Sequence, residues 1–582
     1  MRNRKMVMGS AAAAAAVLIG LVSVYGASSG VQPVIELMTE SEMEETESET
    51  EEPEVLFNLL DQLTSADSGK AMQEEVMMEA AVDGGWMEPP QISWNTEQYS
   101  TVGETGFRTV KQYPFSTFGM DVDTASYALL RRNILDDTMD WMPEDGIRIE
   151  EMINYFNYEY EAPRGEDTFS ITAQIAPCPW NPDTKLLLVG LQARDIPAEE
   201  IPDQNLVLLV DTSGSMYDAQ KLPLAVDALK LLLEDMDEND SISLVTYAGS
   251  SEVLLEGVKC TPEGREEIAA ALDGLQAEGG TYGETGLRTA YDLAQASYAE
   301  GANNRVLLLT DGDFNLGQTD DSELVKLVEE KAEGRIFLSI LGFGSGNYND
   351  ALAETLADKG NGNYSYIDSD MEARRVMGGA LKGTLNTVAK DAKIQIDFNP
   401  AQIRGYRQIG YENRQMDAED FEDDTKDGGE VGAGQQVTAL YELVMADSDF
   451  EIRSAKSRYE QTEAGTSDGA AAADGETADP AADAANPSAG EYLTVSIRYK
   501  DPDAQKSRLQ ELPVDASAES EEMSDNMSWA AGVAQAGMLL RKSEFAGDSD
   551  YETVRSRLRE LTGGDEFREE FIYLLSRVGK GE

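Results

Sequence analysis

Three short polar clusters carry the side chains with which this sequence could do chemistry. They are residues 211–215 (DTSGS), 279–283 (GGTYG) and 310–313 (TDGD). Each cluster supplies carboxylate or hydroxyl oxygens, and its glycines permit the tight loops that would let such groups converge. Oxygen donors without imidazole or thiolate favour a hard cation, Mg²⁺ first, with Mn²⁺ or Ca²⁺ as alternatives. The clusters therefore predict a divalent-cation site.

The first cluster alone also has an ordinary structural explanation. An Asp or Ser at the start of a helix accepts hydrogen bonds from backbone N–H groups. The other two clusters favour a metal site over a helix cap. Residues 279–283 lead into a helical pattern, and residues 310–313 directly follow an apolar strand. Three such clusters in this order favour the metal site over the helix cap.

The elements that must position these clusters alternate between apolar strands and amphipathic helices. The predicted strands are residues 206–210, 242–247, 306–310, 336–341 and 364–367. The predicted helices are residues 222–233, 265–275, 287–299, 323–332, 349–357 and 371 to about 388. Such alternation predicts a doubly wound α/β domain, Rossmann-like, with a mainly parallel sheet covered on both faces. Binding sites in these folds lie at the carboxyl ends of the strands, where the first and third clusters fall.

The sequence on both sides of this α/β unit is β-rich and helical. Before it we predict helices at 125–135 and 147–156 and strands at 169–175 and 185–191; after it, strands at 393–398, 437–444 and 493–499 and then apolar helical faces. Because the flanking strands are similar in character, we expect them to pair into one β domain that the α/β unit interrupts. A tract rich in Ala, Asp and Gly at about residues 460–490 is predicted to be an unstructured insertion.

The N-terminal region has the features of an export signal. Basic residues at positions 2, 4 and 5 precede an uncharged segment from Met6 to Ile35. This segment is also long enough to remain as a transmembrane anchor, since about 20 apolar residues span a bilayer. The acidic low-complexity sequence that follows, to residue 114, is predicted to be a stalk. We therefore expect an extracytoplasmic protein, either membrane-anchored or secreted to the cell surface.

Composition excludes several classes of site and partner. The net charge of −64 repels nucleic acid and anionic membranes, so membrane contact is expected only through the N-terminal segment. The absence of histidine removes Ser-His-Asp and Cys-His catalysis and His-ligated zinc. Two cysteines, Cys178 and Cys260, are too few for a disulfide framework, although one bridge between them stays open as a less favoured alternative.

Together the three clusters resemble the metal-ion-dependent adhesion site (MIDAS) of von Willebrand factor A (VWA) domains. By this resemblance the metal ligands are Asp211, Ser213, Ser215, Thr281 and Asp311. In the family the hydroxyl groups usually contact the ion directly, and the aspartates often act through water. A Glu or Asp of the ligand commonly completes the coordination, which implies binding of a protein partner and no enzymatic role.

The resemblance extends to a bacterial cell-envelope subfamily with VWA domains. Residues 116–127, 148–156 and 176–182 are similar to its N-terminal flanking domain, and residues 431–442 and 498–502 to its C-terminal domain of unknown function. Many members are lipoproteins, whereas this chain lacks the lipid-acceptor cysteine. The implied domains are residues 1–35 (signal peptide or anchor), 36–114 (stalk), 115–200 (VWA-associated N-terminal domain), 201–390 (VWA domain) and 391–582 (C-terminal β-rich plus helical domain).

Three alternatives stay open. The ion could merely stiffen the loops of a structural envelope component. A metal-dependent hydrolase with Asp313 or Glu284 as the base is less favoured, because no histidine or nucleophile pair supports it. Asp121 and Asp123 could form a second metal site, but an acidic pair at a helix N-terminus is the preferred interpretation.

Overall fold

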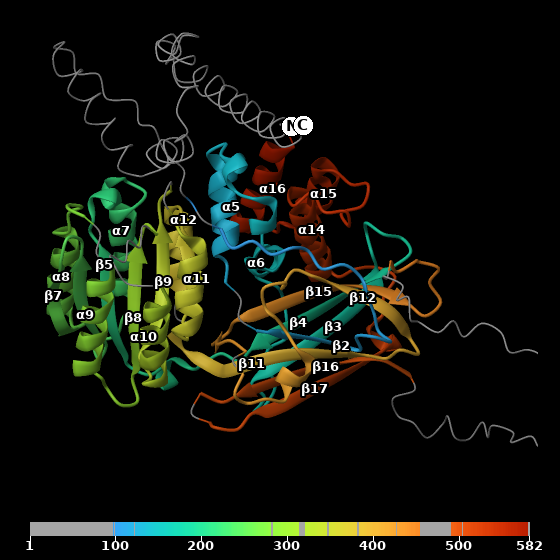
Figure 1. Cartoon of the computed structure of the whole chain (residues 1–582), viewed down its shortest axis with the longest axis horizontal. Helices are drawn as coiled ribbons and strands as arrows, with labels where there is room; N and C mark the ends of the chain where they lie inside the picture. The colour runs from blue at the N-terminus through green and yellow to red at the C-terminus, as the bar shows by residue number, and fades with distance from the viewer. Residues whose placement is uncertain are drawn as a thin grey trace, which may run out of the picture. The chain divides into compact units, whose positions relative to one another are not determined.

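The computed structural model (Figure 1) describes most of the chain from residue 97 onward. The described residues are 97, 99–120, 123–280, 283–312, 321–345, 348–380, 383, 385–426, 428–453, 490–502 and 504–579. The predicted signal or anchor, most of the predicted stalk and the insertion at about 460–490 lie outside them. Among the described helices, none combines the length and the apolar character that crossing a membrane would require.

A six-stranded sheet forms the α/β unit, in the order β10-β9-β8-β5-β6-β7. All neighbouring strands are parallel except β6 and β7. Their bounds are Gln204–Asp211 (β5), Ser241–Tyr247 (β6), Ser251–Lys259 (β7), Asn303–Thr310 (β8), Phe337–Phe343 (β9) and Tyr364–Ile367 (β10). The predicted doubly wound, mainly parallel sheet is confirmed. Strand β7 was not predicted, because this edge strand is largely exposed and carries no clear apolar alternation.

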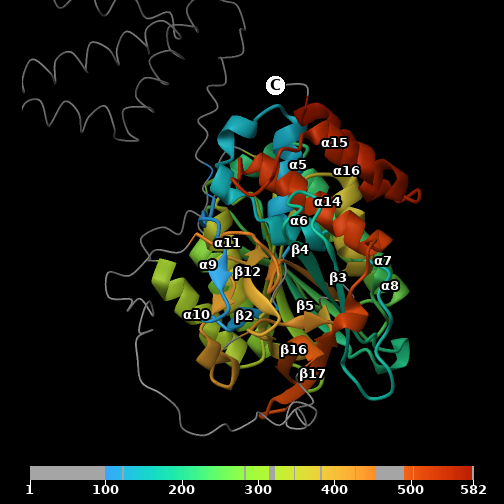
Figure 2. The ribbon, with the colours of Figure 1, turned by 90° about the vertical axis from the view of Figure 1, so that its right-hand side faces the viewer.

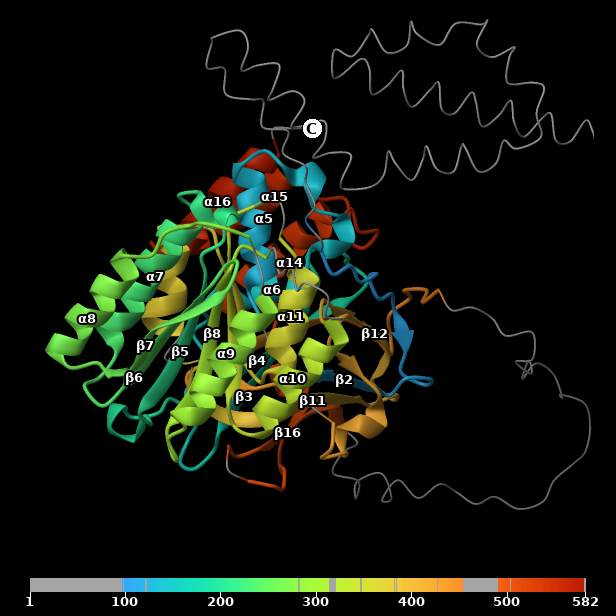
Figure 3. The ribbon, with the colours of Figure 1, turned by 60° about the vertical axis from the view of Figure 1, so that its left-hand side comes forward.

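Helices cover both faces of this sheet, because successive strand residues point to opposite sides. Leu206 and Leu208 of β5 pack in one core with α7 and α8, whereas Val207 and Leu209 pack in another core with α9, α10 and α11. Figure 3 shows α9, α10 and α11 together over the sheet. Their bounds are Leu222–Asp235 (α7), Pro262–Asp273 (α8), Gly283–Ala296 (α9), Asp321–Glu333 (α10) and Asp350–Lys359 (α11).

The last predicted helix of the α/β unit differs from the structure. Helix α12 (Asp370–Arg374) passes into a π-helical turn (Arg375–Ala380) that contains two adjacent glycines. Helical backbone recurs at Gly383 and Leu385, but strand β11 (Thr387–Phe398) then begins, so the helix cannot reach residue 388. The β-branched pair Thr387-Val388 suits the strand, whose first residue pairs with Gly432.

Two antiparallel sheets surround a further core and use strands from both sides of the α/β unit. Their orders are β1-β12-β15-β4-β3 and β13-β2-β11-β16-β17, with β14 paired to β11. The expected β domain, interrupted by the α/β unit, is therefore confirmed. The strands are Arg108–Thr109 (β1), Phe115–Gly119 (β2), Phe169–Pro177 (β3), Lys185–Ala193 (β4), Ile403–Ile409 (β12), Gln415–Met416 (β13), Val431–Gly432 (β14), Gln436–Met445 (β15), Glu491–Lys500 (β16) and Arg508–Asp515 (β17).

Ordered structure begins before the predicted boundary at residue 115. Strand β1 pairs with β12, and Glu97 forms a buried ion pair with Arg132 at 2.8 Å. Both contacts join residues that are far apart in the sequence, so the local pattern of this acidic region could not predict them. Cys178 and Cys260 are both buried and are not bridged.

Five helices form a separate cluster that packs on the outer face of β4 and β15. Its core includes Phe156, Trp529 and Phe571 together with Leu188 and Leu440 of the sheet. Figure 2 shows the helices gathered on one side of the β strands. They are Ala125–Leu135 (α5), Ile149–Asn154 (α6), Asp525–Leu540 (α14), Tyr551–Leu558 (α15) and Glu566–Val578 (α16).

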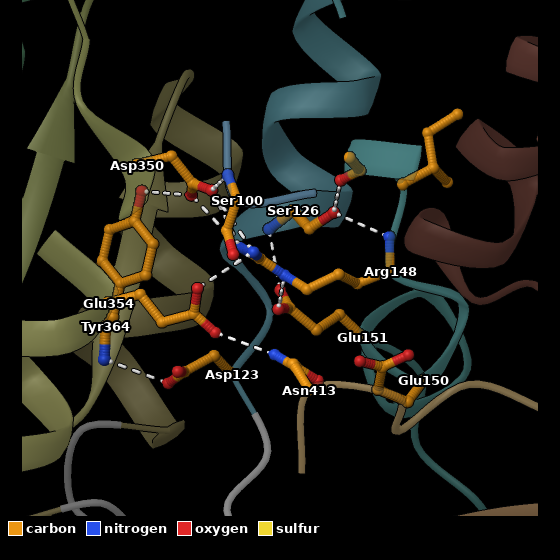
Figure 4. A network of polar contacts seen from close by, with 12 residues as sticks. Ser100, Asp123, Ser126, Arg148, Glu150, Glu151, Asp350, Glu354, Tyr364 and Asn413 are labelled. Carbon is orange, nitrogen blue, oxygen red and sulfur yellow. Dashed lines mark hydrogen bonds and ion pairs between the residues drawn. The ribbon is translucent and has the colours of Figure 1, made fainter. Parts of the chain in front are cut away.

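A buried polar network joins this helical cluster to the α/β unit (Figure 4). Arg148, just before α6, forms ion pairs with Glu151 at 2.5 Å and with Asp350 and Glu354 of α11 at 3.1 Å each. Asp123 accepts a hydrogen bond from the Tyr364 backbone N–H at 3.0 Å and pairs with Arg414 at 3.2 Å. Asp123 thus serves as a structural link; its suggested metal-site companion, Asp121, lies outside the described residues.

One carboxylate in this region is held in an unfavourable environment. Glu150 is 4 % exposed. Burial, and then the nearby charge of Glu412, raise its pKa from 4.5 to about 6. Because the folded pKa is the higher one, proton binding stabilises the fold. This contribution is fully present below about pH 4.5 and is lost as the pH rises through about 6.

The substitution Glu150→Gln should therefore remove part of the pH dependence of stability. Relative to the wild type, the variant should gain about 1 kcal/mol in free energy of unfolding between about pH 5 and pH 8. Urea unfolding at several pH values measures this difference. Glu161→Gln, on a side chain that is 76 % exposed, is the control and should follow the wild type. Parallel curves for wild type and Glu150→Gln would contradict the prediction.

Candidate metal centre

The two carboxylates of the predicted site lie side by side at the carboxyl edge of the sheet. Asp211 is the last residue of β5, and Asp311 directly follows β8. The two strands are parallel neighbours in which Val210 lies opposite Leu309. Both carboxylate residues are fully buried, with 0 % exposure. The sheet register alone therefore brings the first and third clusters together.

Three hydrogen bonds fix the orientation of the Asp211 carboxylate. Its Oδ1 accepts from the Ser213 backbone N–H at 2.8 Å. Its Oδ2 accepts from the Tyr247 hydroxyl at 3.1 Å and from the Thr310 hydroxyl at 3.4 Å. Tyr247 ends β6 and Thr310 ends β8, so both neighbours of β5 contribute to holding this carboxylate.

The serine hydroxyls lie at the spacing that a small cation needs. Ser213 Oγ and Ser215 Oγ are 2.9 Å apart. Adjacent ligands of an octahedral Mg²⁺ at about 2.1 Å are separated by roughly 3 Å. The donor set is entirely oxygen, and within the described residues no cluster of three or more Asp, Glu, Cys or His side chains offers another metal site. These residues fit a hard divalent cation.

Thr281, the fifth predicted ligand, lies outside the described residues. The chain just before it is held against the first cluster by two backbone hydrogen bonds. Gly214 N–H donates to Gly279 O at 3.0 Å, and Glu278 N–H donates to Thr212 O at 2.8 Å. The structure therefore brings together Asp211, Ser213, Ser215 and Asp311, and it leaves the position of Thr281 as a prediction.

The electrostatics of the site also favour a cation. Burial, and second the negative charge of Asp311, raise the pKa of Asp211 to about 6. A divalent cation would favour the ionised form of both carboxylates. One positive charge is already close, because Lys221 Nζ donates to Asp311 Oδ2 at 2.8 Å.

Gly312 lets the chain turn sharply away after Asp311. Its φ is +80°, and an added Cβ would lie 2.4 Å from Tyr348 Cδ2 and 2.8 Å from the Asn349 backbone nitrogen. Its N–H donates to Thr310 Oγ1 at 3.1 Å. Only glycine fits this combination of backbone angle and close approach, which explains the Asp-Gly pair in the third cluster.

Sequence reasoning missed two groups at this centre. Tyr247 lies within a predicted strand, and Lys221 directly precedes a predicted helix, so neither stands out from its pattern. A polar hydroxyl at the carboxyl end of a central strand was the available signal for Tyr247. Of the side chains considered as hydrolase bases, Asp313 lies outside the described residues and Glu284 pairs with Arg288 at 2.9 Å.

Comparison with protein-family models assigns most of the described chain. The von Willebrand factor type A domain model matches residues 205–378, and a model named von Willebrand factor matches residues 93–188. A third model, named for the C-terminal region of the uncharacterized protein YfbK, matches residues 383–580.

Individual proteins are also similar to this chain. The uncharacterized protein YfbK of Escherichia coli (strain K12) is 38% identical over 489 residues, which cover 82% of this chain and 80% of that protein. Human inter-alpha-trypsin inhibitor heavy chain H3 is 30% identical over 176 residues, or 29% of this chain and 20% of its own. A solved von Willebrand factor type A protein from Catenulispora acidiphila covers 72% of this chain and 91% of its own, at 15% identity and a TM-score of 0.38.

The substitution Asp211→Asn should stabilise the metal-free protein and abolish its response to metal. Removing one of two mutually repelling buried charges should raise the free energy of unfolding by about 1 to 2 kcal/mol in EDTA at about pH 7.5. Millimolar Mg²⁺ should then raise the melting temperature of the wild type but not of the variant, because only the wild type binds the ion.

Asp218→Asn is the matched control for this measurement. Asp218 is exposed and lies three residues beyond Ser215, and its Oδ1 accepts from the Gln220 backbone N–H at 2.9 Å, a bond that Asn can keep. It should retain the Mg²⁺ response. A metal-free Asp211→Asn protein that melts below the wild type would contradict the prediction.

Proposed function

The chain belongs to the bacterial family of the Escherichia coli protein YfbK, which carries a von Willebrand factor type A domain, and from this premise we propose that it is an exported protein that binds a protein partner through a divalent cation. The cation is held by residues 211–215, Thr281 and Asp311. Mg²⁺ is its preferred identity, with Mn²⁺ or Ca²⁺ as alternatives. The protein acts by binding, without catalysis.

The observation that carries this proposal is the convergence of Asp211 and Asp311 with the hydroxyl pair of Ser213 and Ser215. Two buried carboxylates and a 2.9 Å hydroxyl pair at one edge of a sheet form a site for a hard cation. VWA domains commonly mediate protein interactions, and residues 205–378 of this chain match that domain.

The chemistry of the site supports a partner that presents Asp or Glu. Mg²⁺ requires about six oxygen ligands in octahedral geometry. The five proposed ligands are two carboxylates and three hydroxyl groups, so one position remains for a further oxygen. A carboxylate supplied by a partner would fill that position and balance the charge of the ion.

An exposed aromatic side chain beside the site supports protein binding further. Tyr217 follows Ser215 by two residues and is 83 % exposed, more than any other large hydrophobic side chain among the described residues. It borders a groove of about 510 Å³ between the start of α7 and the end of α8, lined by Pro223, Val226 and Leu275 among others. Exposed aromatic residues next to apolar pockets commonly anchor protein partners.

Export is proposed from the N-terminal segment, in which basic residues precede an uncharged stretch. The strongly acidic sequence would then keep the folded part away from anionic membrane surfaces. This arrangement suits a protein held at the cell envelope or released at the cell surface, where it meets a protein ligand.

Metal-dependent capture tests the proposal directly. The purified chain is immobilised and exposed to an envelope extract in Mg²⁺ or in EDTA. A specific protein should be retained in Mg²⁺, and it should be lost both in EDTA and with the variant Asp211→Ala. Equal retention of that protein in Mg²⁺, in EDTA and with Asp211→Ala would contradict metal-mediated binding. Stabilisation by Mg²⁺ with no retained protein would favour the structural envelope component instead.

Replacing Tyr217 should weaken partner binding without affecting the metal. With Tyr217→Ala, recovery of the captured protein should fall by roughly tenfold, because a central aromatic contact is lost. The increase in melting temperature with Mg²⁺ should equal that of the wild type. Tyr573→Ala on α16 is the control, since Tyr573 is also exposed, at 52 %, but belongs to the helical cluster. Undiminished recovery with Tyr217→Ala would exclude this surface from the interface.

A further inference from the structure

The candidate metal centre contains a cation supplied by the chain itself. Lys221 directly precedes α7, and its Nζ donates to Asp311 Oδ2 at 2.8 Å. The lysine side chain is 10 % exposed and that of Asp311 is 0 % exposed. This ammonium group therefore occupies one oxygen of a carboxylate that the metal also needs, in a place where solvent screens the charges only weakly.

The lysine side chain is held in place along its length. Gly344, at the end of β9, has a φ of +72°, and an added Cβ there would lie 2.3 Å from Lys221 Cε and 2.4 Å from Cγ. The aliphatic part of Lys221 thus lies directly against the backbone of Gly344. In turn Gly344 O accepts hydrogen bonds from Arg132 Nη1 at 2.9 Å and from the Tyr366 hydroxyl.

The anchoring of Gly344 extends into the N-terminal flank. Arg132 belongs to α5, is 5 % exposed and is paired with Glu97. The position of Lys221 is therefore determined by packing as well as by its attraction to Asp311. The packing and the ion pair together hold the ammonium group beside Asp311.

We propose that Lys221 is a tethered cation that holds Asp311 while the site is without metal and thereby lowers the affinity of the site for divalent cations. This inference rests on the proposed function, since it concerns the same site. The ammonium group and the metal ion are both positive and use the same carboxylate, so binding of the ion must displace or repel the lysine. In the metal-free state Lys221 offsets part of the repulsion between Asp211 and Asp311.

Two other roles for Lys221 give different results. A lysine that only stabilises the fold would leave the metal affinity unchanged on removal. A lysine that orients Asp311 for coordination would, on removal, weaken metal binding. Only a competing cation predicts tighter binding in its absence.

The test measures Mg²⁺ and Mn²⁺ binding to the full chain by isothermal titration calorimetry at constant ionic strength. Lys221→Met keeps the apolar part of the side chain and removes the charge. It should bind both ions at least about tenfold more tightly than the wild type. Its metal-free form should also melt at a lower temperature, because the carboxylates lose their counter-ion.

Lys230→Met is the matched control. Lys230 lies on α7, its side chain is 36 % exposed, and it pairs with Asp273. Both variants remove one positive charge from the same region, so the long-range field changes equally. Since solvent and salt screen an exposed charge, Lys230→Met should bind metal within about twofold of the wild type.

A second variant guards against misfolding of the first. Lys221→Gln also removes the charge, but its amide can still donate a hydrogen bond at this buried position, so it keeps a polar group beside Asp311. It too should bind metal more tightly than the wild type.

The outcomes separate this inference from the proposed function. A wild type that binds metal, with Lys221→Met equal or weaker, overturns the inference and leaves the metal site intact. No binding of either ion by the wild type and by Lys221→Met overturns both. Binding by Lys221→Met alone, with none by the wild type at the same metal concentration, supports the competing lysine.

Discussion

The α/β unit is inserted into a β domain, and both of its connections are bound by one short loop. Ala193 N–H, on the incoming chain, donates to Gln435 O at 2.8 Å, and Gly434 N–H donates to Arg194 O at 3.0 Å. On the outgoing chain, Ala433 N–H donates to Gly383 O at 3.0 Å and to Asn386 O at 2.9 Å. The loop between β14 and β15 therefore ties the entry and exit of the insert together. These hydrogen bonds fix where the chain leaves the host and where it returns.

Buried charges then fix how the insert meets the helical cluster. Arg131 of α5 pairs with Asp368 and Glu372 of the insert and, at 3.3 Å, with Glu570 of α16. Arg148 and Arg414 make comparable links to α11. Removing one partner of a buried pair leaves an uncompensated charge, at a cost of roughly 3 to 5 kcal/mol. Such pairs hold a specific arrangement more strictly than apolar packing would. The next residue of α5, Arg132, donates to Gly344 O and so connects this helix to the metal centre.

Much of the fold could be predicted from the periodicity of apolar residues, and the strands that were not predicted were missed for physical reasons. Helix α5 has the predicted bounds because its apolar residues recur at helical spacing. Strands β5, β6 and β8 lie within a few residues of theirs because each is a mainly apolar run that is buried throughout. Strand β12 was missed since it mixes Arg, Gly and Gln, and its buried Arg407 is paired with Glu104 and Glu442, at 3.1 Å each, from segments far apart in the chain. Strand β17 alternates little because most of its residues are exposed.

Some residues of the candidate site could likewise be predicted from the sequence, and others could not. Asp211, Ser213, Ser215 and Asp311 could be proposed from sequence because the strand ends of a parallel sheet must meet at one edge. Lys221 and Gly344 could not, because their roles depend on distances between segments far apart in the chain. A helix-start lysine has the same sequence signature whether it points to water or to a carboxylate.

The interleaved strands also determine the order in which the protein can form. Strands β2 and β4 emerge early, but their partners β11 and β15 lie beyond the whole α/β unit, so only the pairing of β3 with β4 can form before it. The insert finds all its strand partners within itself, so its contacts are closer in sequence and its loop-closure entropy is smaller. Synthesis would thus deliver a finished insert before β2 and β4 have met their later partners, and the host sheets would assemble last. During that interval the early strands need protection from other chains, and the high negative charge of the sequence provides it through mutual repulsion.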